Sequence, residues 1–418
     1  MLIFHTKFII YLYNPFFKTF FTETEMKTAG VVAEYNPFHS GHKYQINKTK
    51  EKTGLPVIAV MSGNFVQRGE CALFDKSVRT RAALMNGADI VFELPLPWAM
   101  SSAEKFASGA VYLLNSTGIC EFLSFGSESG NVERITDAAD ALLNIDENII
   151  KKYLTDGCSY PTARQKALEE SAGEEISSVL SSPNDLLGVE YVKSVIKNKY
   201  PLTPITIKRS GAGHDSDETN ESTASASAVR SIINSSLDYS PFVPENTLEL
   251  YIKSKKSDMK DLEKCILSHL RRKKALDFLS YPDVSEGLEY RIYEAVRNSD
   301  SLDSLYSKIK TKRYAHSRIR RIIMSAFLEI DRSYTLAAPP YLRVLGFTDE
   351  GRNILKQMKN TASVPVIMRY SDVNALDERA KKVFELECKS TDLFALAFNP
   401  VLKCGNEMRR EIIYIHTR

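Results

Sequence analysis

The sequence predicts an α/β protein, with a doubly wound parallel sheet in its first half and a mostly α-helical domain after it. Short apolar runs alternate with helix-compatible segments from residue 27 to about residue 209. Apolar strands separated by helices are typical of a parallel sheet covered on both faces. After residue 231 the strand signal fades, while the helical spacing of apolar residues continues. A chain of 418 residues has room for both parts.

Strand-like runs and helix-like segments alternate through the first half of the chain. The expected strands are residues 28–33, 57–61, 89–93, 121–125 and 204–208. The expected helices are residues 43–52, 76–86, 99–116, 132–143 and 186–198. Together these elements define a predicted domain over residues 26–230. Residues 210–227 are rich in Gly, Ser, Thr and Asp and predict a loop near its end.

The second half reads as packed helices, which define a predicted domain over residues 231–418. The expected helices are residues 229–234, 245–254, 259–278, 287–297, 302–328, 350–359 and 375–388. A strand-like run at 364–368 lies between the last two expected helices. We therefore expect the end of the chain to form a small C-terminal subdomain or to complete the helical domain.

The first 25 residues are expected to form an extension outside the fold. They are rich in Phe, Tyr and Ile, but Lys7, Lys18 and the Asn14-Pro15 pair interrupt the apolar run. The segment therefore lacks the continuous apolar stretch of a signal peptide or a membrane span, and no membrane partner is expected. A second methionine, Met26, stands just before the first expected strand, where we expect the fold to begin.

Composition is typical of a globular protein and excludes several function classes. Charged residues make up 26% of the chain and hydrophobic ones 43%, and the net charge is only +3. A nucleic-acid surface would therefore need local clustering of basic residues. The six cysteines are scattered without a C-x-x-C pair, which predicts neither a zinc site nor a disulfide framework and favours a cytoplasmic location.

The strongest functional signal is the turn after the first expected strand. The strand breaks at Asn36-Pro37, and a helix begins near the sequence His39-Ser-Gly-His42. In an open α/β sheet a ligand binds beyond the carboxyl end of a strand and at a helix N-terminus. Imidazoles at this position can donate to a phosphate, and Gly41 allows a ligand to approach the backbone. The alternative is two surface histidines in an ordinary strand–helix turn.

Other segments fall at the same edge of the predicted sheet. Gly126 follows the fourth strand, Asn184 stands at a probable helix start, and Arg209 ends the last strand. Ser225, Ser227 and Arg230 open a later helix, where hydroxyls, free amides and a guanidinium can form a triphosphate cradle. Taken singly, each of these is equally well a turn, a helix cap or a solvated edge.

The helical half carries two basic clusters that predict an RNA-backbone surface. The run from 308 to 321 holds seven Lys or Arg residues and no acid, with Tyr314 and His316 among them. The alternative for each cluster is a solvated helix face. The residues assigned to this surface are Arg271, Arg272, Lys273, Lys274, Lys312, Arg313, Arg318, Arg320 and Arg321.

These motifs carry a resemblance to a known family. His39-Ser-Gly-His42 resembles the HxGH signature of the nucleotidyltransferase superfamily, and residues 224–230 resemble its second signature, with departures at Ala224 and Ala226. The longer run from Val31 through residues 61–70, with 93–95, 125–128 and Pro183-Asn184, resembles the bacterial tRNA(Met) cytidine acetate ligases. The resemblance implies a Rossmann-like nucleotidyltransferase domain joined to a helical tRNA-binding domain.

The resemblance also implies a reaction and a set of site residues. ATP and acetate would form acetyl-adenylate, and the acetyl group would pass to the exocyclic amine of the wobble cytidine of elongator tRNA(Met). His39 and His42 would be catalytic, and Mg²⁺ would neutralise phosphate charge, with no metal site built from protein ligands. The implied ATP-binding residues are Val32, Ala33, Glu34, Tyr35, Asn36, Pro37, Phe38, His39, Ser40, Gly41, His42, Lys43, Tyr44, Gln45, Gly126, Asn184, Arg209, Ser210, Ser225, Ser227 and Arg230.

Two other functions are consistent with parts of this pattern. A small-molecule adenylyltransferase acting on a phosphorylated cofactor precursor shares both motifs, but it does not need a basic helical domain. A non-catalytic RNA-binding protein would not need His39, His42 and Arg230 together. The sequence leaves open the oligomeric state, a homodimer included, and the group that accepts the proton in the transfer step.

Overall fold

The computed structural model describes residues 26–209, 224–285, 287–312 and 314–416. The predicted extension over residues 1–25 and two predicted site residues, Ser210 and Arg313, lie outside these ranges.

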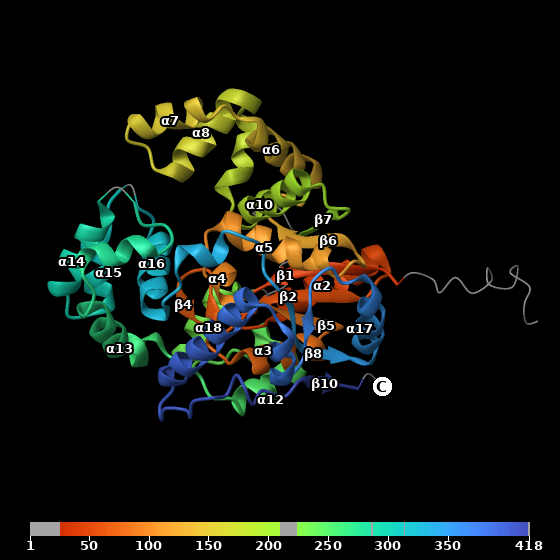
Figure 1. Ribbon diagram of the computed structural model, residues 1–418. Helices are drawn as coiled ribbons and strands as arrows, with labels where there is room; N and C mark the ends of the chain where they lie inside the picture. The colour runs from red at the N-terminus through yellow and green to blue at the C-terminus, as the bar shows by residue number, and fades with distance from the viewer. Residues whose placement is uncertain (1–25, 210–223, 286, 313, 417–418) are drawn as a thin grey trace, which may run out of the picture.

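A twisted, mostly parallel sheet forms the centre of the molecule (Figure 1). Its strands are β1 (Thr28–Ala33), β2 (Val57–Ser62), β5 (Ile90–Leu94), β6 (Cys120–Ser127), β7 (Thr203–Lys208), β8 (Leu342–Thr348), β9 (Val366–Ile367) and β10 (Ile413–Ile415). The strand order is β10-β8-β5-β2-β1-β6-β7, and β9 pairs with β8. The five strands predicted in the first half are confirmed, and they pair in parallel with one another.

The C-terminal part of the chain corrects the predicted division into two domains. Residues 342–348 form β8, which pairs antiparallel with β5, and β10 then pairs in parallel with β8. The end of the chain thus extends the sheet of the first half and forms neither a small C-terminal subdomain nor a completion of the helical domain, while β9 lies within the predicted strand-like run 364–368. The run Leu342–Thr348 is almost entirely buried, and its one cation, Arg343, is paired inside the protein.

Helices cover both faces of the sheet. They are α2 (Ser40–Thr53), α3 (Lys76–Met85), α4 (Leu96–Ala99), α5 (Ala103–Ser116), α6 (Val132–Asn144), α10 (Pro183–Asn198), α11 (Ala226–Asn234), α12 (Glu245–Ile252), α17 (Asp349–Thr361) and α18 (Glu378–Phe394). Successive side chains of β2 point to opposite faces of the sheet, so the core has two parts. Val57 and Ala59 pack with α2, α3, α11 and α12 on one face, and Ile58 and Val60 pack with α5, α6 and α10 on the other. The predicted helix over 99–116 is two helices, α4 and α5.

Two groups of helices project from this body (Figure 1). The upper lobe contains α7 (Glu147–Thr155), α8 (Tyr160–Ala172) and α9 (Glu174–Ser177). The helical lobe contains α13 (Met259–Arg271), α14 (Leu288–Arg297), α15 (Leu302–Ile309) and α16 (His316–Leu328), whose apolar core also includes Phe65, Leu96 and Phe394 from the main body. No helix in the described ranges is both long and apolar enough to cross a membrane.

Two predicted helices of the second half are shorter in the structure. The predicted helix 302–328 is broken between α15 and α16, because Arg291 caps the end of α15 by donating to the carbonyl of Ile309 at 2.8 Å. Lys310 Nζ then donates to the carbonyls of Thr311 and Tyr314, both at 2.7 Å, and holds the connecting turn. The predicted helix 259–278 ends at Arg271 and continues as a 3₁₀ turn over Ala275–Ser280.

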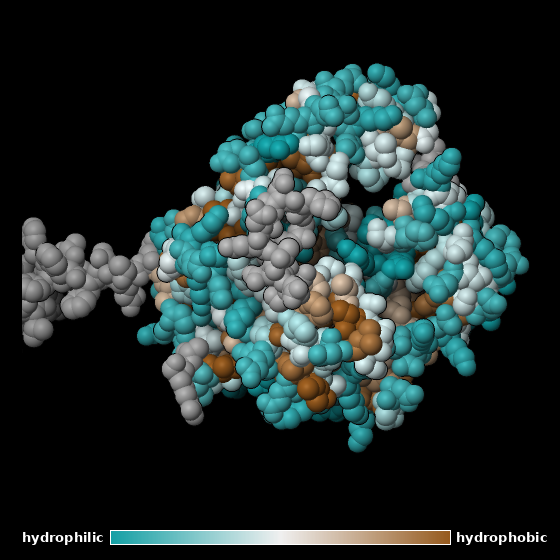
Figure 2. Space-filling view, turned by 180° about the vertical axis from the view of Figure 1, so that it is seen from behind, coloured by the Kyte–Doolittle hydropathy of each residue, from teal (hydrophilic) through white to brown (hydrophobic). Residues whose placement is uncertain are grey.

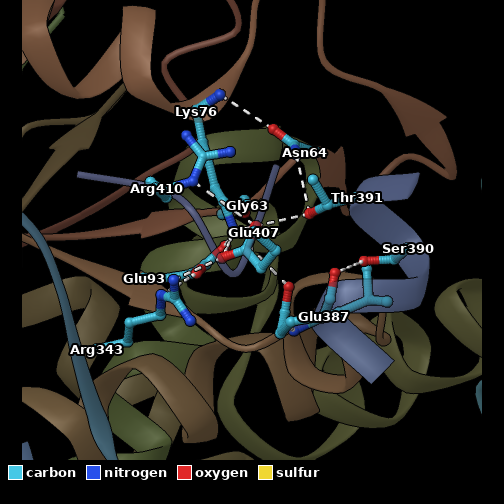
Figure 3. A network of polar contacts seen from close by, with 12 residues as sticks. Gly63, Asn64, Lys76, Glu93, Arg343, Glu387, Ser390, Thr391, Glu407 and Arg410 are labelled. Carbon is cyan, nitrogen blue, oxygen red and sulfur yellow. Dashed lines mark hydrogen bonds and ion pairs between the residues drawn. The ribbon is translucent and has the colours of Figure 1, made fainter. Parts of the chain in front are cut away.

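A buried cluster of charged side chains joins the C-terminal segment to the sheet (Figure 3). Lys76 is fully buried, and its Nζ lies 2.5 Å from Glu93 and 2.9 Å from Glu407. Arg343 contacts Glu407 at 2.7 Å, and Arg410 contacts Asp75 at 2.9 Å. Burial alone would raise the pKa of Glu407, but the charges of Lys76, Arg343 and Arg410 lower it.

Glu387 completes this cluster and makes stability depend on pH. Burial and then the charge of Glu93 raise the pKa of Glu387 from 4.5 to about 8. The folded state therefore keeps a proton that the unfolded state releases, so this stabilisation is full below about pH 4.5 and is lost as the pH rises through about 8. Replacing Glu387 with glutamine should raise the free energy of unfolding, relative to wild type, more at pH 9 than at pH 5. Denaturant unfolding at both pH values measures this, and an equal effect at both contradicts it.

Candidate active site

The predicted motifs meet in a cavity of about 510 Å³ at the carboxyl edge of the sheet. The cavity lies where β1, β6 and β7 end and where α2, α10 and α11 begin. Because β1 has β2 on one side and β6 on the other, this is the point at which the strand order changes direction. From behind, the surface is hollowed between the upper lobe and the helical lobe, and hydrophilic residues line the hollow (Figure 2).

His39 and His42 form a reciprocal cap at the start of α2. The Nδ1 atom of His39 accepts from the backbone N–H of Gly41 at 3.0 Å, and the Nδ1 atom of His42 accepts from the backbone N–H of His39 at 3.3 Å. The two ring centroids are 3.9 Å apart. Since each Nδ1 atom is an acceptor, each neutral ring carries its proton on Nε2. The helix cap therefore provides two N–H donors beside the cavity that both rings line.

Both imidazoles are neutral at physiological pH. Burial and then the charge of Arg209 lower the pKa of His39 from 6.5 to about 4. Burial, the neighbouring His39 and Arg209 lower the pKa of His42 well below its ordinary value. The site can thus offer hydrogen bonds to an anion without holding a buried charge when the anion is absent.

A buried arginine fixes the backbone around this motif. Arg79 is fully buried and donates to the carbonyls of Glu34 at 2.7 Å, Ser62 at 3.0 Å and Phe74 at 3.0 Å. Its guanidinium thereby ties the ends of β1 and β2 to the start of α3. Asn36 accepts from the backbone N–H of Leu73 at 2.8 Å, which holds the turn before the histidines.

On the far side of the cavity, two carboxylates connect the end of β6 to the start of α10, because each accepts hydrogen bonds from backbone N–H groups of the other segment. Glu128, after β6, accepts from Asn184 Nδ2 at 2.5 Å and from the backbone N–H of Asp185 at 3.0 Å, at the start of α10. Asp185 in return accepts from the backbone N–H groups of Glu128 and Ser129, both at 3.1 Å. Arg209 continues β7 at this side and donates its backbone N–H to the carbonyl of Ser127 at 2.9 Å.

The third wall comes from the start of α11. Ser225 caps this helix by accepting from the backbone N–H of Ala228 at 3.2 Å, and Ser227 follows two residues later. Arg230 donates to the carbonyl of Asn36 at 2.5 Å and to Ser227 at 3.0 Å. The arginine thus links α11 to the histidine motif, whereas the sequence analysis placed it in a triphosphate cradle.

The structure places most, but not all, of the predicted ATP-binding residues on the cavity wall. Those on the wall are Val32, Ala33, Glu34, Tyr35, Asn36, His39, His42, Gln45, Gly126, Asn184, Arg209, Ser225 and Ser227. Phe38 is instead buried in the core, and Lys43 and Tyr44 are exposed on α2. The others that do not line it are Pro37, Ser40, Gly41 and Arg230.

Several cavity residues were not among the predicted site residues. They are Gln67, Arg68, Ala103, Phe106, Phe125, Glu128, Pro183, Leu186, Leu187, Tyr191 and Ala226. Gln67 and Arg68 belong to the hairpin of β3 (Phe65–Val66) and β4 (Glu70–Cys71), within the segment 61–70 that carries part of the family resemblance. The apolar residues of α5 and α10 show only the ordinary signal of a packed helix.

The predicted RNA surface is divided by the structure. Arg271, Arg272, Lys274 and Lys312 are exposed. On α16, however, Arg318 donates to the carbonyl of Asp283 at 2.7 Å, Arg321 pairs with the carboxylate of Asp283 at 3.3 Å, and Arg320 pairs with Glu70. The α16 arginines therefore hold the lobe together and join it to the hairpin. Lys273 lies 5.2 Å from the ring centre of Tyr281.

A doubly wound sheet with paired histidines at the start of a helix, at its switch point, defines a nucleotidyltransferase-type protein. Residues 26–408 match the model of the HIGH Nucleotidyl Transferase family. The tRNA(Met) cytidine acetate ligase of Clostridium novyi is 39% identical over 408 residues, which cover 93% of this chain and 100% of that protein. The ligase of Acetivibrio thermocellus is 36% identical over 413 residues, with coverage of 93% and 100%.

Solved structures agree with these relatives. The crystal structure of Thermotoga maritima TmcAL bound with alpha-thio ATP superposes with a TM-score of 0.86 at 31% identity, covering 94% of this chain and 100% of that one. The apo structure of the same protein gives a TM-score of 0.87 at 31% identity. The chain therefore belongs to the tRNA(Met) cytidine acetate ligase family, a family of ligases within the HIGH nucleotidyltransferases.

Proposed function

We propose that the protein joins ATP and acetate into acetyl-adenylate and transfers the acetyl group to the exocyclic amine of the wobble cytidine of elongator tRNA(Met). The observation that carries this proposal is the pair of Nε2 donors that the α2 cap presents beside a cavity with Arg209 on its wall. This arrangement suits a nucleoside triphosphate whose α-phosphate is attacked by a carboxylate. We also propose a cytoplasmic location, because the described cysteines are free thiols, as is usual in a reducing compartment, and because the tRNA substrate is found there.

In the first step an acetate oxygen attacks the α-phosphorus and pyrophosphate leaves. Acetate is already ionised at pH 7, so this step needs no general base. Negative charge builds up on the phosphate oxygens, and the Nε2–H groups of His39 and His42 are placed to stabilise it, together with the positive end of the α2 dipole. Preorganised donors of this kind contribute about 10²–10³ in rate each.

The β- and γ-phosphates would be held by the start of α11 and by Arg209. Ser225 and Ser227 line the cavity, and the bound Arg230 keeps that helix against the histidine turn. Within the described ranges no three His, Cys, Asp or Glu side chains form a metal cluster. We therefore place Mg²⁺ on the phosphates of ATP itself, where oxygen ligands and water suit it and where it would supply charge neutralisation.

The exposed basic residues at the end of α13 are proposed to contact the tRNA backbone. Both Arg272 and Lys274 have exposed side chains. Replacing them with alanine should weaken tRNA binding, and each phosphate that is no longer neutralised should flatten the slope of log Kd against log salt by about one unit. Binding measured between low and moderate salt tests this.

The matched control replaces Lys356 and Lys359, two exposed lysines on α17 at the other side of the molecule (Figure 1). This control should keep the wild-type slope. If the slope of log Kd against log salt is the same for the α13 variant and the wild type, Arg272 and Lys274 face solvent and do not contact the tRNA phosphates.

The proposed function is tested by incubating the protein with ATP, acetate and bulk bacterial tRNA, and then analysing the nucleosides by mass. We expect acetylcytidine that requires both ATP and acetate. Pyrophosphate release with a phosphate-bearing small molecule, and no modified nucleoside, would instead indicate a small-molecule adenylyltransferase.

A further inference from the structure

One part of the cavity wall, called the recess below, is apolar, which a phosphate site does not need. Ala103 and Phe106 at the start of α5 line it, together with Phe125 at the end of β6. Leu187 and Tyr191 from α10 complete the wall, and the rings of Phe125 and Tyr191 lie 5.8 Å apart. Aromatic and aliphatic walls of this kind favour a flat, weakly polar ring over a phosphate or a small anion.

Two polar groups of the same recess have bonding capacity left. The Oε1 atom of Glu34 accepts from the backbone N–H of Gln67 at 2.8 Å, whereas its Oε2 atom has no hydrogen-bond partner in the described ranges. Tyr191 is only 3% exposed, and its hydroxyl likewise has no partner among those residues. Glu34 is half-buried, and both residues line the cavity, so each can form a hydrogen bond with a ligand bound there.

We infer that this recess receives the base of the wobble cytidine, and that Oε2 of Glu34 accepts a hydrogen bond, and then the proton, from its N4 amine. This inference rests on the proposed function and concerns its second step. A carboxylate accepting from N4 is the ordinary way in which proteins recognise cytosine. Tyr191 would contact the same ring by a hydrogen bond to its O2 or N3 edge.

The charge of Glu34 distinguishes cytosine from acetate as the occupant. Acetate would bring a second carboxylate against that of Glu34, which is unfavourable in a buried site, whereas an amine donates to it. The adenine of ATP also carries an amine, and the predicted ATP contacts Gly126 and Asn184 line the same cavity, so adenine bound at Glu34 would show as a loss of ATP–pyrophosphate exchange. Tyr191 is seven residues after Asn184 on α10, which is about 10 Å along a helix axis.

The transfer step then balances. The N4 nitrogen attacks the carbonyl carbon of acetyl-adenylate, so a C–N bond forms. The bond between that carbon and the phosphate oxygen breaks, and AMP leaves with its electron pair. The N4 proton passes to Oε2 of Glu34 and from there to water. Burial raises the pKa of the Glu34 carboxyl above 4.5, although Gln67 and the charges of Arg68, Arg230 and Arg79 oppose this, and a raised pKa makes it a better proton acceptor.

The test compares two half-reactions in Glu34→Gln, because glutamine keeps the oxygen that accepts from Gln67. One assay is acetate-dependent exchange of ATP with pyrophosphate, and the other is single-turnover acetyl transfer to tRNA. We expect the rate of transfer to fall about 10²-fold or more beyond any fall in the exchange rate. Tyr191→Phe should raise the KM for tRNA about tenfold more than the KM for ATP. Glu51→Gln, an exposed acid on α2, is the matched control.

The outcomes separate this inference from the proposed function. Wild-type protein that makes no acetylcytidine would contradict the proposed function. Wild-type protein that makes it, with Glu34→Gln transferring at the wild-type rate, would overturn only the inference. Equal losses in both half-reactions, or a change confined to the KM for acetate, would also overturn it, because Glu34 would then act in the first step.

Discussion

Replacing His39 with alanine is expected to lower the rate of acetate-dependent exchange between ATP and pyrophosphate by about 10²–10³-fold. The imidazole is a neutral donor beside the cavity, because its Nδ1 accepts from Gly41 and its pKa is lowered to about 4. The affinity for tRNA should stay close to that of wild type, because His39 lies at the start of α2 and is not one of the exposed basic residues proposed to contact tRNA. A normal exchange rate in this variant would remove His39 from catalysis.

The alanine variant also removes a helix cap, so a second variant separates the two roles. Asparagine is a good cap residue and can accept from the N–H of Gly41, but it is too short to place a donor where Nε2 stands. His39→Asn should therefore unfold at nearly the wild-type temperature and still lose most of the exchange activity. A stable, fully active His39→Asn protein would show that the histidine acts only as a cap.

Replacing Lys76 with methionine is expected to have the largest effect on stability. The ammonium lies between Glu93 and Glu407 and has no exposure to solvent. Its removal leaves two buried carboxylates that only Arg343 and Arg410 then balance, and breaking a buried ion pair in this way costs about 3–5 kcal/mol. The loss is measured as the change in the free energy of unfolding in denaturant.

The matched control for this prediction is Lys48→Met. Lys48 also forms an ion pair, with Glu51 at 2.6 Å, but both side chains are largely exposed. Such a pair contributes less than about 1 kcal/mol. Similar losses for Lys76→Met and Lys48→Met would show that the buried cluster does not hold the C-terminal segment on the sheet.

The fold was predictable from the sequence where a strand is a continuous apolar run. The runs at 28–33 and 57–61 are of this kind, and both lie in the middle of the parallel sheet. β8 could not be found in this way, because Arg343 and Gly346 interrupt its pattern. The arginine is tolerated inside only because Glu93 and Glu407, far away in the sequence, meet it in the folded protein.

The candidate site was predictable where its residues share one local motif. His39 and His42 stand at a strand–helix turn whose geometry follows from the sequence around it. Gln67, Phe106 and Tyr191 come from a hairpin and two other helices, and only the packing of α5 and α10 on the sheet brings them to the cavity. In the same way, the sequence assigned Arg318 and Arg321 to an RNA surface, because it could not show that Asp283 lies beside both in the folded protein.

The site is proposed to activate acetate by joining it to the α-phosphate of ATP. The most direct measurement supplies acetate labelled with oxygen-18, together with ATP and tRNA, and determines by mass where the label goes. If acetate attacks the α-phosphorus and the acyl–oxygen bond later breaks, one acetate oxygen remains on AMP. We predict AMP that carries one oxygen-18 atom for each acetylcytidine formed. Unlabelled AMP, or label found in inorganic phosphate together with ADP, would contradict this mechanism.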